Sequence, residues 1–96
     1  MRTMVTASIP VEGGNAAVKD GRLAQVMGAM MDRHHPEAAY FFAEHGRRTA
    51  MFVIDLKDPS QIPSIAEPFF RELNASVTFL PVMNADDLKK GLSKIS

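Results

Sequence analysis

Residues 39–56, AYFFAEHGRRTAMFVIDL, contain two apolar segments, 39–43 and 49–56, on either side of the polar segment 44–48. Two β-prone segments separated by a short glycine-containing segment predict a β-hairpin. We expect a wide loop of four or five residues around Gly46, because the polar segment is too long for a two-residue turn. The hairpin is the reference for the rest of the fold, since the other elements must be placed against it.

Length and charge narrow the possible functions. A chain of 96 residues predicts one domain, spanning residues 1–96. Its 11 basic and 11 acidic side chains cancel, and the absence of a basic stripe argues against a nucleic-acid partner. No apolar stretch is long enough for a membrane helix or a signal peptide, so we expect a cytoplasmic protein without a membrane partner. The chain has no cysteine, which excludes disulfides, thiolate catalysis and cysteine-based metal sites.

The first half of the chain predicts a strand followed by a helix. Residues 3–9 are β-prone and are followed by Pro10. Residues 11–15 predict a loop in which Asn15 caps the next helix. Apolar side chains at helical spacing then predict a helix that begins firmly only after Gly21 and that Pro36 ends near residue 35. The side chains on this stripe are Leu23, Val26, Met27, Met30 and His34.

The second half predicts a helix, a strand and a short final helix. The segment DPSQ, residues 58–61, has the pattern of a capping box with proline at the first helical position. The helix that follows should run to about residue 74 with a bend at Pro68. Residues 75–83 predict a strand, which Pro81 restricts to a sheet edge because proline has no amide hydrogen to donate. Residues 86–95 predict the last helix.

These elements give the order β-α-β-β-α-β-α. This order favours an α+β, ferredoxin-like fold with a four-stranded antiparallel sheet and the main helices on one face. In that fold the first and third strands are central, and the second and fourth are edges. The edge position that Pro81 requires therefore coincides with the position of the fourth strand.

The strands are apolar on both faces. In the segment 49–56, the alternation of a strand puts Phe52 and Ile54 on one face of the sheet and Met51 and Val53 on the other. The second and fourth strands also have apolar residues on both faces. An antiparallel sheet with one solvated face should instead alternate apolar and polar residues. Because the helices can cover only one face, we expect a second copy of the chain to cover the other. This predicts a homodimer with the two sheets packed face to face.

The chain resembles a known superfamily in its length, element order and double-faced sheet. The runs EHGRRTAMFVIDLKDPSQIPSIAEPFF and SVTFLPVMNADDL are similar to uncharacterised small bacterial members of the dimeric α/β-barrel superfamily. That superfamily includes cofactor-free monooxygenases, muconolactone isomerases and haem-degrading enzymes. The resemblance implies a small-molecule pocket between sheet and helices, without a catalytic signature that would fix a reaction.

Two residues are candidates for proton transfer. Asp55 lies near the end of the most apolar strand, and burial would raise its pKa and make it a general base. His34 is the second candidate, with a haem-ligand role as a remote alternative. Both residues also have ordinary explanations, namely an exposed or ion-paired strand end for Asp55 and a helix-end histidine for His34.

Four residues are candidates for ligand binding. Arg48 could hold an anion through its guanidinium; the alternatives are a solvated turn, or a pair with Glu44 across the hairpin. Tyr40, the one tyrosine, could donate a hydrogen bond into a pocket. Glu67, beside the proline of the second main helix, and Thr6 on the first strand could also line a cavity.

No metal or cofactor motif is present. His34 and His35 are adjacent, so on a helix their side chains point about 100° apart and cannot readily bind one ion. We therefore expect no metal and no cofactor. Three functions stay open: a homodimeric small-molecule-binding or accessory domain, a cofactor-free monooxygenase or isomerase, and a structural interaction module recruited through its last helix. Convergence of Asp55, Tyr40 and Arg48 on one cavity would favour the enzyme.

Overall fold

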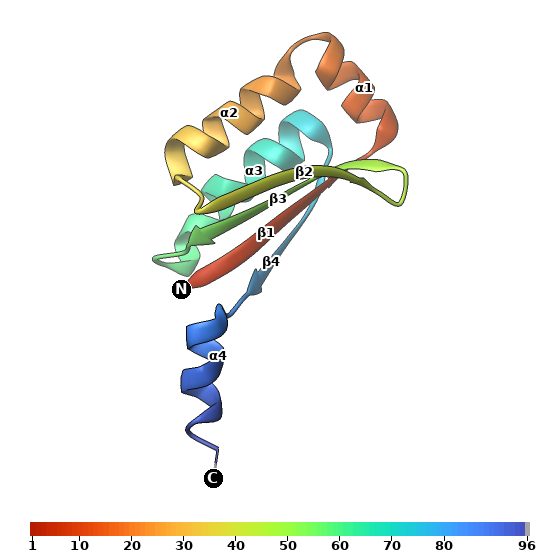
Figure 1. Ribbon diagram of the computed structural model, residues 1–96. Coiled ribbons are helices and arrows are strands. Elements are labelled where there is room, and N and C mark those ends of the chain that lie inside the picture. The colour runs from red at the N-terminus through yellow and green to blue at the C-terminus, as the bar shows by residue number, and fades with distance from the viewer. Residues whose placement is uncertain (96) are drawn as a thin grey trace.

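The computed structural model describes residues 1–95, which form one four-stranded sheet with helices (Figure 1). A single turn of 3₁₀ helix, Pro59–Gln61, precedes α3. In chain order, the strands and α-helices are β1 (Arg2–Ile9), α1 (Val11–Lys19), α2 (Arg22–His34), β2 (Ala38–Glu44), β3 (Arg47–Asp55), α3 (Ile62–Leu73), β4 (Ser76–Pro81) and α4 (Ala85–Leu92).

The sheet has the strand order β2-β3-β1-β4, and every neighbouring pair is antiparallel. β1 and β3 are therefore central, and β2 and β4 are edges, which confirms the predicted ferredoxin-like α+β fold. Pro81 is the last residue of β4 and lies opposite Thr3 of β1. The missing amide hydrogen of proline is tolerated there because β4 has a neighbour on one side only.

The prediction of one helix after a loop was wrong, because residues 11–34 form two helices. α1 begins at Val11, directly after Pro10, and Gly21 adopts a left-handed conformation with φ of 83° before α2 starts. Sequence propensity disfavours a helix through Gly13 and Gly14. Gly14 is nevertheless buried, and a Cβ on it would lie 3.2 Å from Ile9 Cγ2. The absence of a side chain therefore lets α1 pack closely against the end of β1.

The prediction of a wide hairpin loop was also wrong. β2 and β3 are joined by the two residues His45 and Gly46, whose φ values are 54° and 74°. Positive φ at both positions is characteristic of the tight turn whose twist matches that of the paired strands. Glu44 consequently lies opposite Arg47, and the strands continue through most of the segment that the sequence indicated as loop.

The capping signals in the second half are confirmed. The Asp58 side chain accepts a hydrogen bond from Ser60 N, and Gln61 Oε1 accepts one from Asp58 N. α3 then continues through Pro68 and ends at Leu73, before a left-handed Asn74. Asn84 caps α4 in the same way, accepting a hydrogen bond of 2.8 Å from Asp87 N.

One face of the sheet forms the core with α1, α2 and α3. Every second residue of β1, from Thr3 to Ile9, is buried on this face, as are Ala50, Phe52 and Ile54 of β3. Phe52 is fully buried, with its ring centroid 5.8 Å from that of Phe41 and 6.0 Å from that of Phe69. This aromatic contact joins an edge strand, a central strand and a helix.

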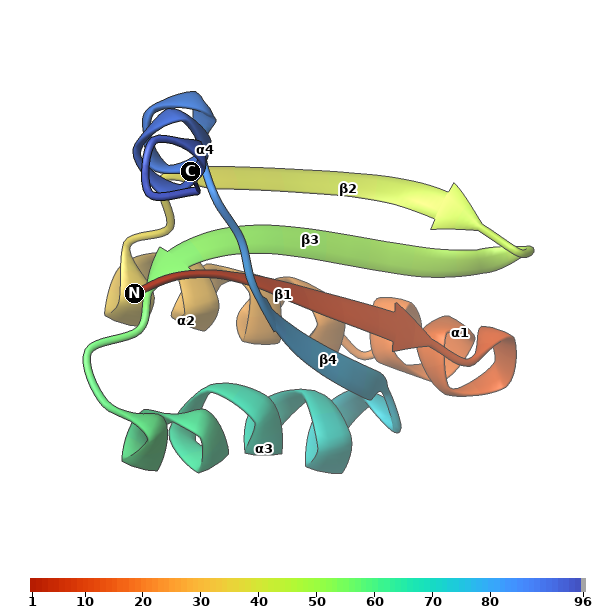
Figure 2. The same cartoon turned by 90° about the horizontal axis from the view of Figure 1, so that it is seen from below.

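The opposite face of the sheet is not covered by these helices; Figure 2 looks onto it. We call it the open face. Tyr40 is 62% exposed, Leu80 52% and Phe42 42%. By the strand register, the open face includes the side chains of Met4, Thr6, Tyr40, Phe42, Met51, Val53, Thr78 and Leu80.

α4 stands away from the rest of the chain. In Figure 1 it extends from the end of β4 on the side of the sheet opposite α1–α3. All its residues are exposed, including Leu88 and Leu92. The radius of gyration is 15.1 Å, whereas a compact chain of this length should have about 12.5 Å. The projecting helix accounts for the difference.

Candidate functional site

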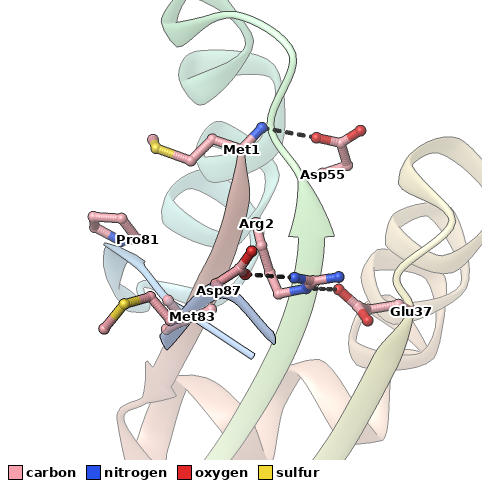
Figure 3. Close-up of a pocket in the computed structure, with 8 residues that line it drawn as sticks. Met1, Arg2, Glu37, Asp55, Pro81, Met83 and Asp87 are labelled. Carbon is pink, nitrogen blue, oxygen red and sulfur yellow. Dashed lines mark hydrogen bonds and ion pairs between the residues drawn. The ribbon is translucent and has the colours of Figure 1, made fainter. Parts of the chain in front are cut away.

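Three cavities along the sheet contain or adjoin the candidate residues. The amino-terminal cavity, of about 730 Å³, lies where α4 leaves the sheet (Figure 3). The His34 cavity, of about 350 Å³, lies where α2, β3 and the segment before α3 meet. The hairpin cavity, of about 440 Å³, lies between the β2–β3 hairpin and α2. The chemistry of their linings differs strongly.

Paired charges dominate the amino-terminal cavity. Arg2 donates to Glu37 Oε1 at 2.6 Å through Nε and to Asp87 Oδ2 at 2.9 Å through Nη1 (Figure 3). The amino group of Met1 lies 2.8 Å from Asp55 Oδ1. Each charge drawn in Figure 3 therefore already has a partner of opposite sign. The arrangement links α4 to β1 and to the segment before β2, and it offers little unsatisfied charge to a ligand.

The His34 cavity brings together the two candidates for proton transfer. His34 is half-buried, and desolvation, helped by the nearby Arg33 and His35, lowers the pKa of its imidazole below the ordinary value. Asp55 lines the same cavity together with Lys57 and Gln61. A neutral imidazole can accept a proton. Neither Arg48 nor Tyr40 lines this cavity, so the binding group expected of the enzyme hypothesis is absent from it.

Asp55 is not buried, so the condition under which it would act as a general base is not met. Its side chain is 60% exposed and accepts a hydrogen bond of 2.6 Å from Lys57 Nζ. Lys57, followed by the amino group of Met1, lowers the pKa of Asp55 from 3.8 to about 2. A carboxylate with so low a pKa is a weak base. Asp55 therefore matches the ordinary explanation of an ion-paired strand end.

The hairpin cavity has a mostly apolar lining. β1, the hairpin and α2 contribute Ile9, Leu23, Met27, Phe41, Phe42, Ala43, Arg48 and Thr49. Arg48 is its one charged lining residue, and the lining contains no acidic side chain. Its volume falls in the range of about 300–1,000 Å³ that small-molecule sites occupy, and such sites combine apolar walls with a few polar groups. This cavity has the composition of a ligand site.

Arg48 is held in place by α1. It is half-buried, lies opposite Ile9 in the sheet, and donates from Nη1 to Asn15 Oδ1 at 3.1 Å. A Cβ on Gly14 would lie 2.8 Å from the same Nη1 and 3.4 Å from Arg48 Cδ. Gly14 thus leaves the space that the arginine side chain occupies. The alternative pairing with Glu44 is not formed, because Glu44 lies opposite Arg47.

The remaining candidates do not reach this cavity. Tyr40 and Thr6 lie on the open face, where both are neighbours of Met51. Glu67 lies on α3, with its carboxylate 3.4 Å from Arg71 Nε. Asp55 and Arg48 are seven residues apart on β3, which corresponds to about 23 Å along a strand. The structure therefore does not bring Asp55, Tyr40 and Arg48 to one cavity.

The sequence did not indicate the residues that shape the hairpin cavity around Arg48. Gly14 and Asn15 were assigned to a loop and a helix cap, and Met27 to core packing. Their role follows from tertiary structure, because α1 lies against the ends of β1 and β3 only after the chain has folded. The one available signal was the pair Gly13-Gly14 within a helix-forming stretch, which indicates a close packing contact.

Within residues 1–95, the histidine, aspartate and glutamate side chains form no group of three or more placed to hold a metal ion. No helix in the same part of the chain has both the length and the apolar character needed to cross a bilayer.

Comparison with known proteins adds information about the fold. No protein-family model and no curated protein matches the sequence. A solved structure of the de novo designed protein Ferredog-Diesel matches with a TM-score of 0.50 and 8% identity, covering 84% of this chain and 85% of the design. The chain has the ferredoxin-like fold. This is the protomer fold that the resemblance to the dimeric α/β-barrel superfamily implies.

A second solved structure is an antibiotic biosynthesis monooxygenase-like protein from Deinococcus radiodurans. It has a TM-score of 0.47 and 11% identity, and the match covers 88% of this chain and 95% of that protein. Neither match bears on the site, because a shared fold does not imply a shared function.

Proposed function

We propose that the protein is a homodimeric small-molecule-binding domain whose ligand occupies the hairpin cavity. The observation that carries this proposal is the composition of that cavity, which is apolar apart from Thr49 and a positioned guanidinium. Apolar walls bind the body of a small molecule, and a single polar anchor fixes its orientation. Catalysis is not part of the proposal, because the acid–base candidates His34 and Asp55 line a separate cavity, near the end of β3 that lies away from the hairpin.

The dimer part of the proposal rests on the open face. Tyr40, Phe42 and Leu80 are between 42% and 62% exposed on one side of a single sheet. An apolar surface of this kind marks an interaction site in a soluble protein. A second copy is the economical partner, because a two-fold axis lets the same surface cover itself. The formal net charge of 0 leaves little electrostatic repulsion between copies.

The projecting α4 also supports self-association. A helix of eight residues is marginal in water without tertiary contacts, yet its apolar Leu88 and Leu92 are 47% and 56% exposed in the single chain. The helix extends on the same side of the sheet as the open face (Figure 1). In a face-to-face dimer this helix reaches toward the partner, where its apolar side can be buried.

Two measurements test the proposal. Light scattering coupled to size exclusion should give twice the chain mass of 10.6 kDa, and a monomer at micromolar concentration would contradict the dimer. A thermal-shift screen of small apolar molecules, acids and amides should then find compounds that stabilise the fold. A ligand at a hundred times its Kd adds about 2.7 kcal/mol to the unfolding free energy. Cavity occupancy is checked by the NMR shift of the Met27 methyl group.

A further inference from the structure

The hairpin cavity contains a cation that the protein itself does not neutralise. Among residues 1–95, no carboxylate oxygen lies within 4.0 Å of the Arg48 guanidinium, whereas Arg2 pairs with two carboxylates and Arg22 and Arg71 with one each. The recorded side-chain partner of Arg48 is the neutral amide of Asn15. A guanidinium has five N–H donors, so most of them stay available to an anion.

The guanidinium is also fixed in position before any ligand arrives. The hydrogen bond to Asn15 holds Nη1, and Gly14 lets the side chain lie directly against α1. Preorganisation of this kind lowers the entropic cost of binding, because the arginine need not be ordered by the ligand. An arginine fork matches the geometry of a carboxylate, which it can bind through two parallel hydrogen bonds.

The rest of the lining decides what the anion must be attached to. Ile9, Leu23, Met27 and Phe41 present apolar surface, which favours an alkyl or aromatic body. No acidic side chain is present to bind an ammonium group, so the lining disfavours an amino acid. A dianionic phosphate is also disfavoured, because one cation and a mostly apolar lining would not compensate for the cost of removing its two charges from water.

Resting on the proposed function, we infer that the ligand of the hairpin cavity is a monocarboxylate with an apolar body. Its carboxylate binds the Arg48 guanidinium, and its alkyl or aromatic part lies against Met27 and Phe41. Gly14 and Asn15 are positioning residues, because they act on the ligand through Arg48.

The test compares acids with their amides. Titration calorimetry measures cinnamate and octanoate against cinnamamide and octanamide, which keep the apolar body and lose the charge. We expect each acid to bind more tightly than its amide. Arg48→Gln should weaken acid binding by about tenfold to hundredfold, as for the loss of a charged hydrogen bond, and leave amide binding unchanged. Arg47→Gln, a neighbour with the opposite side-chain parity, is the matched control and should change neither.

Gly14→Ala is a second variant, which keeps the positive charge of Arg48 but changes its position. The added methyl should displace the guanidinium and weaken the acids while leaving the amides unaffected, and circular dichroism confirms that the variant is folded. Binding is located by the methyl shift of Met27, with Met83 at the amino-terminal cavity as the reference.

The outcomes separate the inference from the proposed function. Equal binding of acids and amides at Met27, or unchanged acid binding in Arg48→Gln, overturns the inference and leaves the cavity as a ligand site. Probes that leave the Met27 methyl unmoved at millimolar concentration overturn both.

Discussion

Tyr40 on β2 offers a sharp test of the dimer, through the substitution Tyr40→Asp. The side chain is 62% exposed on the open face. Since a buried aromatic contributes about 150–250 Å², roughly 120 Å² of Tyr40 is available to a partner. At about 25 cal/mol per Å² this area contributes about 3 kcal/mol per copy, as an upper limit because part of it stays solvated in the interface.

In the proposed dimer, a two-fold axis places Tyr40 in the interface twice, so the substitution removes the contribution of both copies. Even if half of the available area is buried, the dimer loses about 3 kcal/mol, which weakens its dissociation constant by more than about a hundredfold. The carboxylate that replaces the ring adds a desolvation cost. Sedimentation equilibrium over a concentration series measures the change.

Val18→Asp is the matched control, because Val18 is 51% exposed on α1, on the other side of the sheet. It also exchanges an exposed apolar side chain for a carboxylate and should leave the dissociation constant unchanged. An unchanged dimer in Tyr40→Asp, or equal weakening by both substitutions, would refute the assignment of the open face as the interface.

The remaining predictions concern core packing, two glycines and one ion pair. Phe52→Ala should lower the unfolding free energy by about 3–5 kcal/mol in urea titrations, because the ring is fully buried between two others; a loss below about 1 kcal/mol would contradict this packing. Gly21→Ala should destabilise by about 1–2 kcal/mol because its φ is positive. Gly28 lies in the middle of α2 with open space around it, so Gly28→Ala should stabilise the protein by about 0.5–1 kcal/mol. If Gly21→Ala and Gly28→Ala changed the unfolding free energy in the same direction, the left-handed conformation of Gly21 would be contradicted. Asp55 should titrate near pH 2 by carboxyl NMR, and Lys57→Gln should raise that pKa toward 3.8. The pKa of Asp55 is lower in the folded than in the unfolded protein, so its stabilisation is present above about pH 4 and is lost as the pH falls toward 2. Titration of wild-type Asp55 at its ordinary pKa would contradict the pair with Lys57.

The features that sequence alone predicted correctly are those with local causes. The DPSQ capping box depends on residues within four positions of each other, and the edge assignment of β4 depends on the chemistry of one proline. The topology followed from the order of the elements, and the double-faced pattern of β3 correctly indicated an uncovered sheet face.

The features that were missed depend on contacts between distant parts of the chain. α1 runs through two glycines because burial of Gly14 against Ile9 and Arg48 offsets its poor helix propensity. The tight turn at His45 depends on strand pairing that forces both turn residues to positive φ. Asp55 also pairs with the amino group of Met1, which is 54 residues away in the sequence, so the residues around Asp55 could not predict this partner.

The left-handed Gly21 also bears on how the cavity can change in evolution. Gly14 and Asn15, which position the arginine, lie on α1, whereas Leu23 and Met27, which line the apolar wall, lie on α2. The angle between α1 and α2 at Gly21 therefore affects the distance between the Arg48 guanidinium and the apolar side chains of α2 that line the cavity. If the hairpin cavity is the proposed ligand site, a substitution or insertion at Gly21 would alter the length of ligand accepted while leaving every lining side chain unchanged, so ligand size and ligand charge would depend on separate parts of the sequence.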